Sequence, residues 1–393
     1  MARSAGWLAR AQRVLQAVAE PGPVEGLLLI PVALGALDSG DPQRAASTFD
    51  EAFAIADRFR DPDLMALAQL GQGQARIMLG ELDDGLRLLD EVMVAVTAGE
   101  VSPVPSGIVY CAVIGSCHLA LDLRRAQEWT IALDHWCGGR PDMVLFSGVC
   151  QMHRAEIYFL HGAWSDALAA AQAALERGRR GDRDAVSGAW YRQGEVQRLR
   201  GEIDAAEESY RRAVRSGYEP EPGLALLRLA QGRPGLAQSL IRRALDGVDP
   251  ATRHGLLPGV VEIELAAGDV AAARRGADEL TAMTSTGAMP MAQAIADQSE
   301  GAVLLEAGGA RRALTRLRRA WSLWQQLDAP YEAARCRVLT ARACRVLGDE
   351  DSASMELEAA RGSSRSSVRD PRSSSWLPCH GRLGGRRRSP DPA

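Results

Sequence analysis

The chain has 393 residues, of which 46% are apolar, 24% are charged and only 5% are aromatic, and its net charge is −4. So few aromatic residues, in a sequence dominated by strong helix formers, favour an all-α protein over a β-sheet protein. The sequence contains no Lys and no Asn. Without Lys this chain cannot supply the catalytic site of a P-loop ATPase, a protein kinase or a Schiff-base enzyme.

The chain begins with a segment that fits one half of a helical hairpin. Within residues 1–24, Gly6, Ala11 and Leu15 have a spacing that recurs further along the chain, and the next copy starts at Gly40. The longest apolar run, residues 26–37, is shorter than the roughly 20 residues that span a bilayer. We expect residues 1–24 to be an incomplete first repeat in a cytoplasmic protein that has no membrane contact.

Residues 25–360 repeat one pattern nearly to their end. A Gly is followed five positions later by a small residue, four further on by an apolar residue, and three beyond that by a small or apolar residue. Eight steps separate Gly40 from Gly348, so the mean period is about 38 residues. The clearest copies begin at Gly40, Gly162, Gly201, Gly232, Gly268, Gly308 and Gly348, and weaker copies begin at Gly80 and Leu121.

This pattern predicts a helical hairpin in every repeat. The Gly ends a first helix in the left-handed conformation, and the following acidic residue, such as Asp41 or Asp269, suits the N-terminus of a second helix. The small residue lets the paired helices approach closely, and the later positions continue one apolar face. Single hairpins cannot bury that face, so we predict an all-α fold, an α-solenoid that winds as a right-handed superhelix.

One repeat resembles a tetratricopeptide repeat. The segment 187–220 has its 34-residue length, although Gln193 and Gln197 stand where the motif usually has Leu and Tyr. Five residues fall on characteristic positions of that motif: Trp190, Gly194, Ala206, Tyr210 and Ala213. The resemblance implies stacked helical hairpins.

Residues 4–360 also resemble the helical-repeat region of bacterial LuxR-type transcription regulators. The similarity lies in four short segments: residues 6–11, 125–130, 329–335 and 347–353. In that family the repeats are a sensory or assembly array, and a separate helix-turn-helix domain binds DNA. The resemblance implies a non-enzymatic interaction or sensory module that contacts DNA only through a domain absent from this chain. The alternative is a free-standing scaffold that binds a peptide or protein partner.

The composition changes abruptly after residue 360. Residues 361–393 contain eight Arg, eight Ser, four Pro and four Gly, with only two acidic residues. A segment so poor in apolar residues is expected to be disordered. The same composition also arises when a GC-rich gene is read out of frame, so two interpretations of this tail stay open.

The concave surface of the predicted superhelix is the expected binding surface for a protein or peptide, or for a second copy of the chain. Alternate positions of the first helices line it when the repeats are aligned on Trp190. The candidate partner-binding residues are Met152, Glu156, Phe159, Tyr191, Glu195 and Arg198. Their mixture of aromatic, apolar and charged groups suits a peptide. The alternative is that they only make contacts between repeats.

Cys and His residues gather in one part of the sequence. They are Cys111, Cys117, His118, His135, Cys137, Cys150, His153 and His161. Zinc modules use tightly spaced ligand pairs, whereas these residues are spread over several predicted helices, so we expect core or groove residues and no metal or cofactor. No catalytic sequence motif occurs either, and we expect no enzyme.

Overall fold

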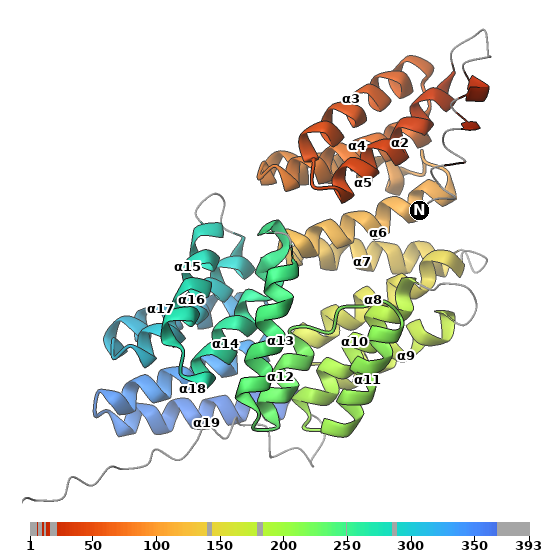
Figure 1. Cartoon of the computed structure of the whole chain (residues 1–393). Coiled ribbons are helices and arrows are strands. Elements are labelled where there is room, and N and C mark those ends of the chain that lie inside the picture. The colour runs from red at the N-terminus through yellow and green to blue at the C-terminus, as the bar shows by residue number, and fades with distance from the viewer. Residues whose placement is uncertain are drawn as a thin grey trace, which may run out of the picture.

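The computed structural model describes residues 22–139, 144–178, 184–248, 250–284 and 289–367, together with residues 6, 10, 11 and 13–15. No residue in these ranges lies in a β-strand, which confirms the predicted all-α class (Figure 1). No helix in this part of the chain is both long and apolar enough to cross a bilayer. The first half contains α2 (Pro23–Asp38), α3 (Pro42–Phe59), α4 (Pro62–Met78), α5 (Leu82–Ala98), α6 (Pro103–Leu119), α7 (Leu123–Gly138), α8 (Val144–Leu160), α9 (Trp164–Gly178) and α10 (Asp184–Leu199).

The second half continues in the same manner, with one short 3-10 helix, η1, before α14. Its elements are α11 (Ile203–Arg215), α12 (Gly223–Ala230), α13 (Pro234–Gly247), η1 (Pro250–Gly255), α14 (Leu257–Ala267), α15 (Val270–Met283), α16 (Pro290–Glu306), α17 (Ala310–Gln326), α18 (Pro330–Val346) and α19 (Glu350–Ser367). Even-numbered helices are the first helices of the repeats, and odd-numbered helices from α3 onward are the second helices.

Each predicted turn Gly lies between the two helices of a pair. All of them have φ between 70° and 84°, the left-handed region that a residue without a Cβ adopts at little cost. They are Gly40, Gly80, Gly162, Gly201, Gly232, Gly268, Gly308 and Gly348. The prediction of helical pairs interrupted at these eight positions is confirmed.

The turn between α6 and α7 has the same conformation without a Gly. Leu121 has φ 58°, and its N–H donates to the His118 carbonyl at 3.1 Å. A side chain in the left-handed region costs roughly 1–2 kcal/mol. The packing of α6 on α7 therefore imposes this turn on a residue that does not favour it.

Acidic residues after the turns do more than complement the helix dipole. The carboxylates of Asp41, Asp269 and Asp349 accept hydrogen bonds from the backbone N–H three residues later, at 2.9–3.0 Å. Glu81 and Glu202 occupy the same position and make no such bond. Asp, whose side chain is one carbon shorter, caps the helix here, as it does at N-termini generally.

The small residue five positions after each turn is buried, as predicted. Ala206 on α11 has no exposed surface, and beside it the Tyr210 ring packs against Gly194 of α10. A Cβ at Gly194 would lie 2.7 Å from Tyr210 Cε1. Ala45, Ala126, Ala167, Ala237, Ala273, Ala313 and Ala353 are equally enclosed at 0% exposure. Small residues thus set the close spacing of the two helices in a pair.

The first helices form a continuous layer. Each one contacts the first helix of the next repeat, from α2 against α4 through to α16 against α18. Each second helix packs on its own first helix and, in most repeats, on the first helix that follows. The stack therefore curves with the first helices on its inner side (Figure 1).

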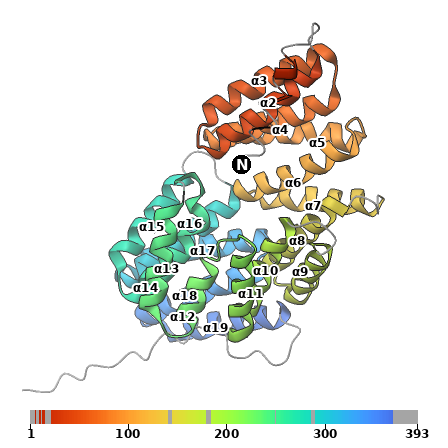
Figure 2. The same ribbon diagram turned by 45° about the vertical axis from the view of Figure 1, so that its right-hand side comes forward.

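The curvature brings distant repeats into contact. The Tyr331 ring of α18 meets the Trp164 ring of α9 at 5.6 Å between centroids, and Val196 and Leu199 of α10 belong to the same apolar cluster. Met289, just before α16, packs against the core cluster of α4–α7. The C-terminal repeats thus return beside the middle of the chain (Figure 2).

Both predicted ends are only partly described. Of residues 1–21, the structure describes residues 6, 10, 11 and 13–15, which are helical, and the rest of the expected incomplete repeat lies outside the described residues. At the other end α19 continues to Ser367, past the predicted boundary at residue 361. Each residue added to a formed helix gains a backbone hydrogen bond, so helices extend beyond a change in composition. Residues 368–393, with the expected disorder, lie outside the described residues.

Candidate functional site on the inner surface

The six predicted partner-binding residues lie on two neighbouring first helices, α8 and α10, which contact each other. Four are half-buried on the inner layer: Met152, Glu156, Phe159 and Arg198. Tyr191 and Glu195 are buried, each with 8% exposure. The structure therefore groups all six, but it leaves only four of them accessible to a partner.

Tyr191 and Glu195 connect α10 to Tyr210 of α11 and to Tyr218 after it. The Tyr191 ring lies 5.8 Å from the Tyr210 ring and 4.9 Å from the Tyr218 ring, measured between centroids. Glu195 accepts a hydrogen bond from the Tyr210 hydroxyl at 2.5 Å. Both side chains thus make packing contacts, which is the alternative that the sequence left open for these residues.

Arg198 keeps Glu195 charged inside the protein. Two guanidinium nitrogens of Arg198 donate to the two Glu195 oxygens at 3.2 and 3.1 Å. Burial would raise the pKa of Glu195, but Arg198 and the Tyr210 hydroxyl outweigh it and hold this pKa below its usual value. Removing Arg198 would leave a buried carboxylate without its counter-charge.

Glu156 is the centre of a second cluster, which joins α6, α8 and α10. Its Oε1 accepts a hydrogen bond from Arg192 Nη2 at 2.8 Å, and its Oε2 lies 3.2 Å from His118 Nε2 and 3.6 Å from His153 Nδ1. Burial would raise the pKa of Glu156, but His118, His153 and Arg192 together hold it well below its usual range. The Arg192 guanidinium also lies over the Phe159 ring, 4.8 Å from the centroid.

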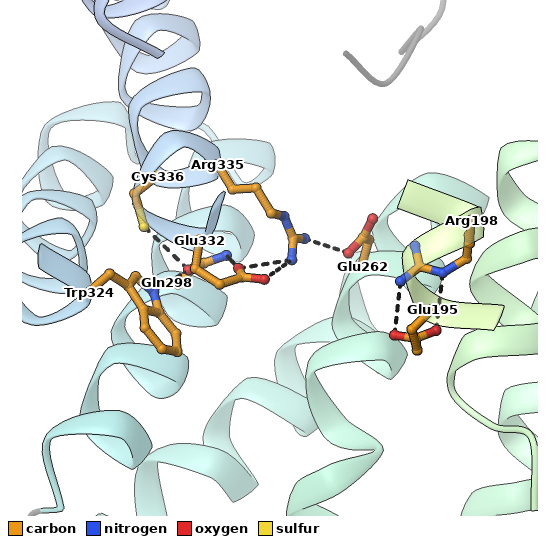
Figure 3. A network of polar contacts seen from close by, with 8 residues as sticks. All are labelled: Glu195, Arg198, Glu262, Gln298, Trp324, Glu332, Arg335 and Cys336. Atoms are coloured by element: carbon orange, nitrogen blue, oxygen red, sulfur yellow. Dashed lines mark hydrogen bonds and ion pairs between the residues drawn. The ribbon is translucent and has the colours of Figure 1, made fainter. Parts of the chain in front are cut away.

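A third cluster comes from the C-terminal repeats. Arg335 of α18 reaches Glu262 of α14 at 2.5 Å and Glu332 at 3.1 Å (Figure 3). Gln298 of α16 donates to Glu332 at 3.1 Å and accepts from Trp324 Nε1 at 2.6 Å. The network ties α14, α16 and α18 together on the side where Figure 3 also shows the Glu195–Arg198 pair of α10.

These three clusters make up what we call the inner polar seam. It consists of Glu156, Arg192, Glu195, Arg198, Glu262 and Arg335, from α8, α10, α14 and α18. Their side chains keep between 10% and 35% of their surface exposed. The seam contains three carboxylates and three guanidinium groups in ion pairs, so a ligand carrying charges of both signs can exchange partners with them.

Sequence reasoning missed half of this seam. Arg192 follows the predicted Tyr191 directly, and the alignment on Trp190 selects its neighbour instead. Glu262 and Arg335 come from repeats to which that alignment assigns no site residue. Their proximity to α10 depends on how tightly the superhelix curves, which no local spacing in the sequence encodes.

The scattered Cys and His residues divide into two groups. Cys117 and Cys150 are buried and Cys111 and Cys137 are half-buried, in agreement with a role in the core. His118 and His153 form the second group: their imidazole rings stack with centroids 5.7 Å apart, next to Glu156. Wide spacing along the sequence thus does not keep these two residues apart in the fold.

Comparisons with solved structures agree with this architecture. A Rap protein, solved in complex with competence and sporulation factor, is 13% identical with a TM-score of 0.63, over 88% of this chain and 100% of its own. The chain has a tetratricopeptide-type fold. A weaker match is the apo quorum sensor NprR from B. thuringiensis, with 13% identity and a TM-score of 0.46 over 90% of this chain and 91% of its own. Another is a tetratricopeptide repeat protein from Parabacteroides merdae, with 14% identity and a TM-score of 0.37 over 81% of this chain and 98% of its own. No family model matches the sequence, and no curated protein does.

Proposed function

We propose that this chain is a non-enzymatic interaction module that binds a peptide or protein segment against the inner polar seam. The observation that supports it most is the seam itself: partly exposed Arg and Glu side chains next to the Phe159 ring, with 16% of the Arg192 side chain and 22% of the Glu156 side chain exposed, on the inner layer of a curved array. Arg and aromatic side chains contribute most of the binding energy in many interfaces. The Rap protein with the same fold is complexed with a competence and sporulation factor.

Because the sequence contains no Lys, the ligand cannot pair with an ammonium group of a lysine side chain. The cationic groups of the inner polar seam are all guanidinium groups, which are planar and bind carboxylates through two parallel hydrogen bonds. We propose a ligand that carries at least one carboxylate and one apolar side chain. The carboxylate replaces a Glu partner of Arg192 or Arg335, and the apolar group packs on Phe159.

We further propose that the module belongs to a LuxR-type transcription regulator, on the strength of the four sequence segments that resemble that family. A free-standing scaffold is the second candidate, because the seam alone suits a partner of either kind. The nucleotide sequence of the gene distinguishes the two candidate functions. A helix-turn-helix encoded in any reading frame past codon 361 supports the regulator, whereas its absence from the whole locus supports the scaffold.

A peptide-library selection tests the binding proposal. The wild-type chain should enrich peptides that contain both acidic and apolar residues. Arg192→Ala or Phe159→Ala should weaken the binding of these peptides by more than about 1 kcal/mol, which is a roughly fivefold to tenfold loss of affinity. Arg312→Ala, at an exposed position on the second helix α17, is the matched control and should bind as the wild type does. Tyr191→Ala is unsuitable, because Tyr191 is packed among other rings. Equal losses for Arg312→Ala would place binding elsewhere.

A further inference from the structure

His118, His153 and Glu156 form a compact group of potential metal ligands. Among the described residues, each offers a ligand atom, and the three atoms lie within 4.8 Å of one another. His118 comes from α6, while His153 and Glu156 are three residues apart on α8 and so share one face of that helix. Two imidazoles and one carboxylate are a donor set that first-row transition metals accept.

The separations match those of a metal coordination shell. A tetrahedral ion with bonds of about 2.0–2.1 Å sets its donors about 3.3 Å apart. Glu156 Oε2 lies 3.2 Å from His118 Nε2 and 3.6 Å from His153 Nδ1. Two of the three donor separations are thus close to this value, and the third is no more than 4.8 Å.

His153 points to a missing ligand. Its residue exposure is only 5%, and neither ring nitrogen has a hydrogen-bond partner. Buried polar groups without partners are rare, and each costs roughly 1–3 kcal/mol. A bound cation beside Nδ1 would supply the missing interaction, while a second imidazole and a carboxylate already face the same point.

The surroundings orient the carboxylate as a ligand. Arg192 donates to Oε1 of Glu156 at 2.8 Å, so the other oxygen, Oε2, is the one turned toward the two imidazoles. Such an outer hydrogen bond fixes ligand geometry in metal sites.

We propose that His118 Nε2, His153 Nδ1 and Glu156 Oε2 bind one divalent first-row transition ion, Zn²⁺ in the first instance. His118 and Glu156 keep 26% and 22% of their side-chain surface exposed, so the cluster lies next to solvent, although His118 Nε2 itself is buried. Three protein donors leave a fourth position for water or for a donor from a bound partner. The site shares Glu156 with the inner polar seam, and metal titration without any peptide tests it separately from the proposed peptide binding.

Metal titration of the full chain, stripped with a chelator and kept reduced, tests the site. Calorimetry with Zn²⁺ should show one ion per chain, and Co²⁺ should give visible absorption bands of nitrogen and oxygen ligands. His118→Ala and Glu156→Gln should each lower the affinity for Zn²⁺ at least tenfold. His161→Ala is the matched control, because His161 is also half-buried and near the end of α8 but outside the cluster.

Three results would overturn the proposal. The first is Zn²⁺ binding that is no tighter in the wild type than in His118→Ala. The second is intense thiolate-to-cobalt charge transfer, which would assign the ion to cysteines. The third is anomalous scattering at the zinc edge that lies away from these three residues. Circular dichroism of each metal-free variant separates a lost ligand from a lost fold, and Glu156→Gln keeps the shape of the side chain where an Ala variant fails to fold.

Discussion

Two kinds of glycine act in this protein, and alanine substitutions should separate them. Gly348 has φ 82°, and a Cβ there would meet nothing within 4 Å, so Gly348→Ala should cost only the backbone strain, roughly 1 kcal/mol of unfolding free energy. Gly71 lies in α4, where a Cβ would come 2.2 Å from the fully buried Phe49 ring. Gly71→Ala should cost roughly 1–3 kcal/mol through overpacking. Urea unfolding of both variants measures the difference.

Gly115 is the control for both substitutions. It is exposed on α6, it has no atom within 4 Å of a built Cβ, and its φ is not positive. Gly115→Ala should therefore stabilise the protein by roughly 0.5–1 kcal/mol, because Ala is the better helix former. A loss of stability at Gly115, or none at Gly348, would contradict this account of the turns.

Close helix pairing depends on the small residue at the start of each second helix. Ala206 on α11 has no exposed surface, so Ala206→Leu should force α10 and α11 apart and lower the unfolding free energy by roughly 1–3 kcal/mol. Ala205→Leu is the matched control on the same helix, because Ala205 is exposed, and it should change stability by less than about 0.5 kcal/mol. An unchanged midpoint for Ala206→Leu in chemical denaturation would show that the repeat register is wrong.

The repeat is readable from sequence because its determinants are local. A turn glycine, an Asp cap and a buried Ala act within one hairpin, so each leaves a signal at fixed spacing, as around Gly201 and Ala206. The candidate site is readable only in part. Glu156 and Arg198 lie where the repeat alignment puts them, whereas the Arg335–Glu262 pair depends on contacts over 73 residues of sequence. The path of the superhelix is the sum of many small inter-repeat angles, and no motif encodes that sum.

An aromatic contact between distant repeats constrains the shape of the whole molecule. Most stability in a repeat array comes from neighbouring units, so the Trp164–Tyr331 contact is an additional constraint on curvature. Burial also raises the pKa of Tyr331 to about 12, and the phenol stays neutral. Tyr331→Ala should open the superhelix and increase the radius of gyration in small-angle X-ray scattering. Tyr331→Phe keeps the ring and should leave it unchanged; identical scattering from all three proteins would show that the contact is incidental.

Charge over the whole molecule leads to the last prediction, that this chain alone does not bind DNA sequence-specifically. The net charge of the chain is −4. Residues 361–393 contain eight Arg and two Asp and so have a net charge of +6, which leaves residues 1–360 with a net charge of −10. Such an array repels a polyanion, and the guanidinium groups of the seam already pair with carboxylates. Arg386, Arg387 and Arg388 can give only weak, salt-sensitive attraction.

A gel-shift titration against genomic fragments at physiological ionic strength checks this prediction. We expect at most a diffuse complex, which disappears with excess competitor DNA or when the three Arg are replaced by Ser. Base-specific binding requires an element held rigidly in a groove, with phosphate contacts fixing its register. A discrete complex that survives competitor and the Arg replacements would mean that the helical repeats themselves contain such an element. In that case the acidic array would have to meet DNA through a local basic surface, and scanning the exposed Arg of α17 would be the way to find it.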